Sequence, residues 1–222
     1  MARGFSRRGR GAGLRFAARL DEGERALLIE LFNQVRDLID PTDSVAAQSD
    51  SSSTQPVSED PFDAIVAGLG ADFGSVTVPD SSAELGGRGF GSEDRDPALD
   101  RLFPAANRTD EDAAREFRRL TEDSLRARKL SGLTASIAAL SEVVDDRVEL
   151  SEQKAITFLV ALTDVRLVLG DRLGLREDAD AERLQAIAEA VDPQEPAAYA
   201  IVVYDFLTWL QETLATSMLP RH

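Results

Sequence analysis

The sequence predicts an all-α protein, a helical bundle in which a long amphipathic helix and a shorter one surround two buried central helices. Residues 151–173 and 197–218 are apolar on nearly every side at 3.6 residues per turn, a pattern typical of helices enclosed by other helices. Apolar residues spaced by threes and fours also run from Ala113 to Val144, which predicts one long helix over 109–145 with a single buried face.

The ends of these helices carry recognisable signals. Residues 21–39 place apolar side chains on one broad face, and Pro41 ends the helix because proline cannot continue one. Ser151 is a suitable N-cap for the first central helix, and Gly174 is well placed to end it. The link 145–150 is so short that the helices on either side of it are predicted to be antiparallel neighbours. Shorter helices are predicted at 61–69, 96–104 and 178–191.

Charge and composition predict how the chain is divided. Residues 1–20 hold six arginines and no acid, so we expect a basic flexible arm. Within it, residues 11–18 show a weak alternation of side-chain character that is compatible with one extended segment. Residues 21–222 are expected to form a single helical bundle domain. Disordered insertions are expected at about 41–60, which is rich in serine and proline, and at about 70–95, which is rich in glycine.

The residue inventory excludes several classes of enzyme. The chain has no cysteine, and its one histidine is the last residue, His222. Zinc sites, Ser-His-Asp triads and thiol chemistry are therefore excluded, and we predict a non-enzymatic protein with no metal and no cofactor. No segment approaches the roughly 18 apolar residues of a membrane span, and the N-terminus lacks the apolar middle of a signal peptide, so we expect a cytoplasmic protein without membrane contact.

Positive charge is concentrated at the N-terminus. The whole chain has a formal net charge of −15, and because residues 1–20 contribute +6, the remainder carries −15 − 6 = −21. Such a body repels nucleic acid, whereas the arm attracts it. Either the arginines are solvated residues of a disordered terminus, or they contact a polyanion or an acidic partner. The candidates for nucleic-acid contact are Arg3, Arg7, Arg8 and Arg10.

A second group of candidates lies on the central helices. Asp164 and Arg166 interrupt the apolar surface of 151–173, and a buried charge is costly unless it is paired. Residues i and i+2 point to different sides of a helix, so each needs another partner. Either these residues form a structural network that fixes helix register, or they form a site. If Arg166 is buried and paired, Arg166→Ala is predicted to cost about 3–5 kcal/mol. The candidate partner or ligand residues are Glu116, Arg119, Asp164, Arg166, Arg172, Tyr204 and Trp209.

The two aromatic candidates allow two interpretations. Tyr204 and Trp209 either belong to the core or line a groove, or they are exposed aromatics that bind a partner.

Four segments together resemble a known family: DPALDRLFPAA at 96–106, EFRRLTEDSLRARK at 116–129, TFLVALTDVRLVLGDRLGL at 157–175 and YDFLTWLQETL at 204–214. Their order resembles an actinobacterial family of acidic helical proteins, a domain of unknown function whose members are described as oxidative-stress transcriptional regulators. The resemblance implies a regulatory role in transcription. If that role uses a thiol switch in the family, this sequence departs from it, because it has no cysteine.

No helix-turn-helix and no basic recognition helix are evident. We therefore expect action through a protein partner, such as a sigma factor or another basic component of the transcription machinery, with the N-terminal arm as the only direct DNA contact. The alternative is a small-molecule-binding bundle or a carboxylate-dependent enzyme centred on Asp164, Arg166 and Tyr204. A closed cavity with converging polar groups there would favour the alternative, and an exposed groove beside the helix 109–145 would favour the regulator.

Overall fold

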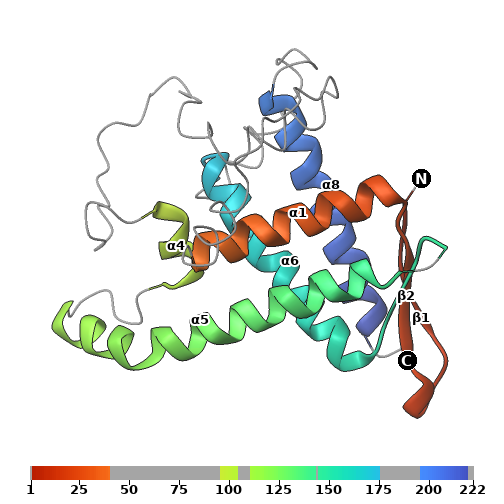
Figure 1. The fold of residues 1–222 in the computed structure, drawn as a ribbon, viewed down its shortest axis with the longest axis horizontal. Helices are drawn as coiled ribbons and strands as arrows, with labels where there is room; N and C mark the ends of the chain where they lie inside the picture. The colour runs from red at the N-terminus through yellow and green to blue at the C-terminus, as the bar shows by residue number, and fades with distance from the viewer. Residues whose placement is uncertain (1, 41–95, 105–110, 144, 176–195, 220–222) are drawn as a thin grey trace, which may run out of the picture. The chain divides into compact units, whose positions relative to one another are not determined.

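In a computed structural model of the chain, the described residues are 2–40, 96–104, 111–143, 145–175 and 196–219 (Figure 1). They form strands β1 (Arg3–Arg8), β2 (Arg15–Arg19) and β3 (Arg147–Leu150), the short 3-10 helix η1 (Gly11–Gly13), and helices α1 (Glu22–Ile39), α4 (Pro97–Leu102), α5 (Glu111–Ser141), α6 (Glu152–Arg172) and α8 (Pro196–Met218). The insertions expected at 41–60 and 70–95 and the helices expected at 61–69 and 178–191 lie outside the described residues.

The predicted all-α class is wrong, because the chain also contains a three-stranded antiparallel sheet in the order β1-β2-β3. Two of its strands and η1 occupy the segment that was expected to be a flexible arm. The sheet is stabilised because each of its strands buries apolar side chains on one face, as in any sheet with one side on a core. The residues of that inner face are Phe5, Phe16, Ala18, Leu20, Val148 and Leu150.

The loop between β1 and β2 depends on glycine. Gly9 has a φ of +73°, a conformation that side chains disfavour, and a Cβ at this position would lie 2.4 Å from the carbonyl oxygen of Gly13. Gly11 also has a positive φ, of +57°. These two glycines let the chain reverse within a few residues, so that β1 can pair with β2.

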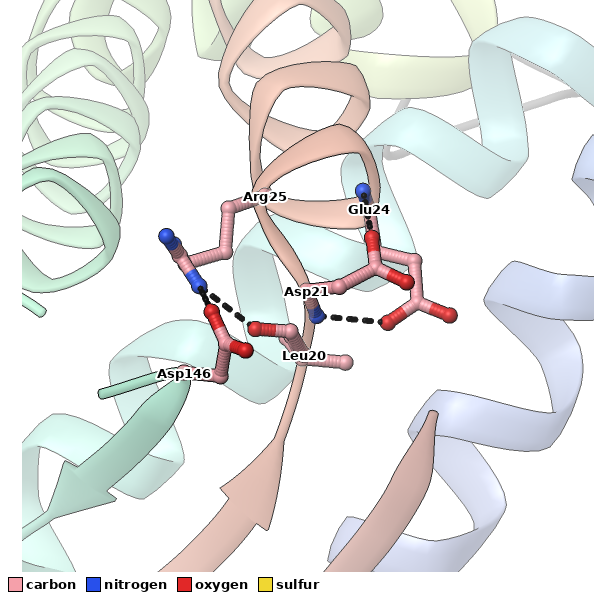
Figure 2. A network of polar contacts seen from close by, with 5 residues as sticks. All are labelled: Leu20, Asp21, Glu24, Arg25 and Asp146. Atoms are coloured by element: carbon pink, nitrogen blue, oxygen red, sulfur yellow. Dashed lines mark hydrogen bonds and ion pairs between the residues drawn. The ribbon is translucent and has the colours of Figure 1, made fainter. Parts of the chain in front are cut away.

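A polar network joins the end of β2 to the start of α1 (Figure 2). The Asp21 side chain accepts a hydrogen bond from the Glu24 backbone N–H at 3.0 Å, and the Glu24 side chain accepts one from the Asp21 backbone N–H at 2.9 Å, which makes a capping box. Arg25 donates to the carbonyl oxygen of Leu20 at 2.5 Å and to Asp146 at 2.7 Å. Because Asp146 directly precedes β3, the same arginine anchors two strands at the first turn of α1.

The four long helices form where the sequence predicts them. The Ser151 side chain accepts from the backbone N–H of Lys154 at 3.4 Å, and Gly174, with a φ of +73°, follows the end of α6. The central helices are less enclosed than predicted, however. Ile156 and Val160 of α6 are 43% and 49% exposed, and Val202 of α8 is 63% exposed. An apolar sequence does not decide whether neighbours exist to cover every face of a helix.

The described residues belong to two compact units. The first holds 2–40, 127–143, 145–166 and 202–219, and the second holds 96–104, 111–126, 167–175 and 196–201. In the first unit Phe158 of α6 makes edge-on ring contacts with Phe5 of β1, at 5.9 Å between centroids, and with Phe32 of α1, at 5.5 Å. These contacts pack the inner face of the sheet and α1 on one core.

In the second unit the start of α4 is tied to the end of α6. The Asp96 carboxylate accepts from the backbone N–H of Ala98 at 2.9 Å and, through its other oxygen, from Arg172 at 2.5 Å. Arg101 lies 3.5 Å from Asp171. Arg172, a candidate site residue in the sequence, therefore takes part in an ion pair between two helices.

Candidate functional site

The outer face of the sheet carries five exposed arginines. In the strand register Arg3 pairs with Arg19, Arg19 with Arg147, and Arg8 with Arg15, and residues that pair in this way share one face. Figure 1 shows the three strands side by side. We call this surface the arginine face, defined by Arg3, Arg8, Arg15, Arg19 and Arg147.

The five arginines form two rows with a gap between them. Arg3, Arg19 and Arg147 lie in one row across the strands, with neighbouring strands about 5 Å apart. Arg8 and Arg15 lie four residues further along, about 13 Å away at the usual rise per residue of a strand. Ser6, Ala17 and Glu149 lie between the rows, and the first two have small side chains.

This part of the sheet is hollowed. A hollow of about 420 Å³ is lined by Arg3, Gly4, Ser6, Arg8, Ala17, Ala18, Arg19 and Arg147. Its middle has short side chains and its rim is basic, so the hollow can admit an anionic group between the guanidinium groups.

The charges of the arginine face are poorly compensated within the protein. The side chains of Arg3, Arg8 and Arg19 make no ion pair with an acid in the described part of the chain, and Arg147 pairs with Glu149 on the same strand at 2.5 Å. Like charges opposite one another destabilise a sheet. Arginines elsewhere have acidic partners, as in the pairs Arg25 with Asp146, Arg101 with Asp171, Arg126 with Glu122 and Arg172 with Asp96. Three of the five guanidinium groups of the face are therefore not neutralised by an acid of the described chain.

The structure regroups the arginines that the sequence singled out. Arg3 and Arg8 belong to the arginine face, whereas Arg7 pairs with the buried Phe16 and so points to the opposite side, and Arg10 is exposed in the turn before η1. Sequence reasoning missed Arg15, Arg19 and Arg147 as site residues. The signal that could have found them is the alternation of charged and apolar residues in RVEL and the even spacing of the two arginines of RFAAR, both of which fit the two-residue period of a strand.

Asp164 is almost completely buried, at 2% exposure, and its partner is Lys129 of α5. The Lys129 ammonium donates to the carboxylate at 2.5 Å. Burial raises the pKa of Asp164 above the ordinary 3.8, and the hydrogen bond and charge of Lys129 oppose that rise. Two further candidate site residues, Glu116 and Arg119, belong to α5, but their side chains lie outside the described part of the structure.

Arg166 has neutral partners, both on α8. Its guanidinium donates to Gln211 at 2.8 Å and to the Tyr204 hydroxyl at 3.3 Å, and it lies 5.1 Å from the centroid of the Tyr204 ring. The amide of Gln211 in turn donates to the Thr163 hydroxyl at 3.0 Å. The condition attached to Arg166→Ala, a buried residue in an ion pair, is therefore not met among the described residues, since α8 supplies an amide and a phenol at this position.

Asp164 and Arg166 do not converge on one point. Asp164 is held by α5 and Arg166 by α8. Neither the hollow of the arginine face nor a second one, lined by Ala139, Glu142, Val143, Arg147, Glu149 and Lys154, contains them or Tyr204.

The chain matches a family model along almost its whole length. Residues 2–218 match the domain of unknown function DUF2017. The chain belongs to this family. The resemblance to a domain of unknown function is thereby confirmed. No curated protein and no solved structure matches the chain.

Within the described residues of this DUF2017 protein, no three acidic, histidine or cysteine side chains gather in a way that could hold a metal ion. None of the described helices is both long enough and apolar enough to cross a membrane. The last candidate, Trp209, is 37% exposed and lies against Phe206, with 6.0 Å between ring centroids.

Proposed function

We propose that this DUF2017 protein is a non-enzymatic, transcription-associated regulator that contacts a nucleic-acid backbone through its arginine face and depends on a protein partner for specificity. The observation that carries the proposal is the set of exposed arginines, three of them without an acidic partner in the described chain, on a protein with a net charge of −15. In such a protein a face of uncompensated positive charge marks where a polyanion is tolerated.

The chemistry of the face suits phosphates better than bases. Guanidinium groups bind phosphate oxygens through paired hydrogen bonds, and contacts of this kind position a protein on nucleic acid without reading its sequence. The two rows, about 13 Å apart, are wide enough to reach phosphates on both sides of a groove. Between its rows the face has the short side chains of Ser6 and Ala17 and a glutamate, Glu149, that is paired with Arg147, so it has little with which to read base edges.

Sequence specificity would then come from a partner. The class of partner proposed is a sigma factor or another component of the transcription machinery. A role in an actinobacterial oxidative-stress response is proposed with it, because of the family resemblance. The proposed location is the cytoplasm. The absence of cysteine means that any signal reaches this chain by a route other than its own thiols.

The alternative, a ligand-binding bundle or carboxylate enzyme centred on Asp164, Arg166 and Tyr204, receives less support. Asp164 is engaged by Lys129, and Arg166 by Gln211 and Tyr204, on separate helices. Groups already satisfied by different neighbours are poorly placed to act on one substrate.

The test is a titration of labelled double-stranded DNA of mixed sequence with the full chain, followed by fluorescence anisotropy at low salt. The variant Arg8→Gln/Arg19→Gln removes two charges from the arginine face. The matched control, Arg128→Gln/Lys154→Gln, removes two charges from exposed positions on α5 and α6.

We expect the first variant to bind DNA about tenfold more weakly or worse, and the control to bind like the parent. Because both variants have the same net charge, a difference between them reports the face itself. Equal losses in both variants, or no DNA binding by the parent, would overturn the proposal.

A further inference from the structure

A second surface of the first unit has the opposite character to the arginine face. Along α8 the side chain of Val202 is 63% exposed and that of Trp209 is 37% exposed, with the half-buried Phe206 between them. Spacings of four and three residues put all three on one side of the helix. The rings of Phe206 and Trp209 lie 6.0 Å apart at an angle of 32°, so each helps to hold the other in place.

Acidic residues border these apolar side chains. Asp205 and Glu212 are both exposed, four residues before Trp209 and three residues after it, which places them beside it on the helix surface. No lysine or arginine occurs in the 23 residues of α8. The surface is therefore apolar at its centre and negative at its border, and no cation of the same helix neutralises it.

Trp209 is the only tryptophan of the chain, and its indole N–H donates no hydrogen bond within the described structure. Tryptophan is the residue most enriched among those that dominate binding energy at protein interfaces, because it combines a large apolar ring with one polar donor. A partly exposed indole with an unused donor is poorly explained by packing within the chain alone.

We propose that this surface, the Trp209 face (Val202, Asp205, Phe206, Trp209 and Glu212), docks a basic amphipathic helix of a protein partner. The apolar side of such a helix covers Val202 and the two rings, while its lysines or arginines reach Asp205 and Glu212. A basic group can also stack on the indole. Nucleic acid is disfavoured here, because phosphates would meet two carboxylates.

The inference goes beyond the proposed function by assigning a second surface to a different class of partner. It shares with that function only the premise that a protein partner exists. The two surfaces carry opposite charges, so each can be tested by variants that leave the other unchanged.

The single tryptophan makes the test direct. A synthetic amphipathic helix of leucine and lysine, labelled with fluorescein, is titrated with the full chain at physiological salt, and Trp209 emission is recorded in a parallel titration with the unlabelled peptide. We expect saturable binding with a blue shift of the tryptophan emission and protection from acrylamide quenching. A peptide of the same pattern with glutamate in place of lysine is expected not to bind.

Variants locate the binding site. Trp209→Ala and Asp205→Asn/Glu212→Gln are each expected to weaken peptide binding about tenfold or more. Their matched controls, Ile156→Ala for an exposed apolar side chain and Glu142→Gln/Glu152→Gln for two exposed acids, are expected to bind like the parent. The charge variant guards against a folding defect in Trp209→Ala, because its two side chains are exposed.

Several results would overturn the inference. Equal losses in the variants and their controls would mean that the peptide binds the acidic protein nonspecifically. Self-association of the parent that Trp209→Ala abolishes would assign the face to a second copy of the chain. The variant Arg8→Gln/Arg19→Gln is expected to keep peptide binding even where it loses DNA binding, so failure of one proposal is distinguishable from failure of the other.

Discussion

At the scale of single residues, the pair of Lys129 and Asp164 is the most consequential contact in the first unit. Asp164 is 2% exposed, and its carboxylate accepts a hydrogen bond from the Lys129 ammonium, whose side chain is 12% exposed. Removing one partner of a buried pair leaves a charge with neither water nor a counter-ion, which costs far more than the intact pair contributes.

We therefore predict that Lys129→Met lowers the free energy of unfolding by about 3–5 kcal/mol. The double variant Lys129→Met/Asp164→Leu removes both charges, so it should recover most of that loss. Urea unfolding followed by circular dichroism measures both values. A loss in Lys129→Met below about 1 kcal/mol, the usual value of a surface ion pair, would show that Asp164 has water or another partner.

The same residue predicts a pH dependence. Burial holds the pKa of Asp164 above its usual 3.8, so between pH 3.8 and the folded pKa the folded state binds more protons than the unfolded state does. The stability that the Asp164 carboxyl contributes is therefore complete below pH 3.8 and is lost as the pH rises through the folded pKa. The side chain of Asp164→Asn does not titrate, so the stability of this variant lacks the pH dependence that Asp164 causes.

We predict that the parent loses stability relative to Asp164→Asn as the pH rises from 3.8 towards neutrality. Free energies of unfolding from urea titrations of both proteins, from acid to neutral pH, test this. A difference between them that stays constant over the whole range, or that changes in the other direction, would contradict the raised pKa.

Sequence reasoning found these positions but not their partners. The polar interruptions at Asp164 and Arg166 are visible in an apolar helix, but which neighbour reaches them depends on the register between helices, which periodicity does not specify. The loss predicted for Arg166→Ala assumed an ion pair. A loss of stability of that size is predicted for Lys129→Met instead, because Arg166 is bound by the neutral side chains of Gln211 and Tyr204.

At the scale of elements, the attachment of β1 to α8 decides whether the arginine face is held in place. The backbone N–H of Phe5 donates to the Thr213 hydroxyl at 3.1 Å. A Cβ on the neighbouring Gly4 would lie 2.6 Å from the methyl group of Thr213, so strand and helix approach as closely as glycine allows.

Gly4→Ala is accordingly predicted to destabilise the protein by about 1–3 kcal/mol, the usual cost of forcing an extra methyl group into a packed contact. Gly13→Ala is the matched control, because a Cβ there meets nothing within 4 Å. Urea unfolding of both variants tests the prediction. An equal effect in the two would show that backbone freedom in the hairpin, and not contact with α8, is what matters.

The sheet was missed for identifiable reasons, although the extended segment suggested at 11–18 overlaps β2. β1 contains one apolar residue, Phe5, and β2 places two alanines, which strands disfavour, between two arginines. β3 has only four residues and was interpreted as a link. Long helices offer many repeats of their period, whereas a short strand offers two or three, so the helices were found and the sheet was not.

At the scale of the whole molecule, the amount of charge was known from the sequence but its grouping was not. The sequence has six arginines before residue 20, and the register of the sheet groups four of them with Arg147 from much later in the chain. The acids of the Trp209 face lie on a helix with no base. A protein of net charge −15 thus presents one positive face and one acidic apolar face in the same unit.

This grouping predicts how DNA binding depends on salt. At physiological salt the screening length is about 8 Å, so acids distant from the arginine face contribute little, and the slope of log K against log salt reports the phosphates that the face contacts. Each such phosphate contributes about 0.9 to that slope, so Arg8→Gln/Arg19→Gln is predicted to make it shallower by about 2. Arg128→Gln/Lys154→Gln has the same net charge and should keep the slope of the parent. Anisotropy titrations over a series of salt concentrations give all three slopes, and a shared decrease in both variants would mean that total charge, and not the arginine face, controls binding.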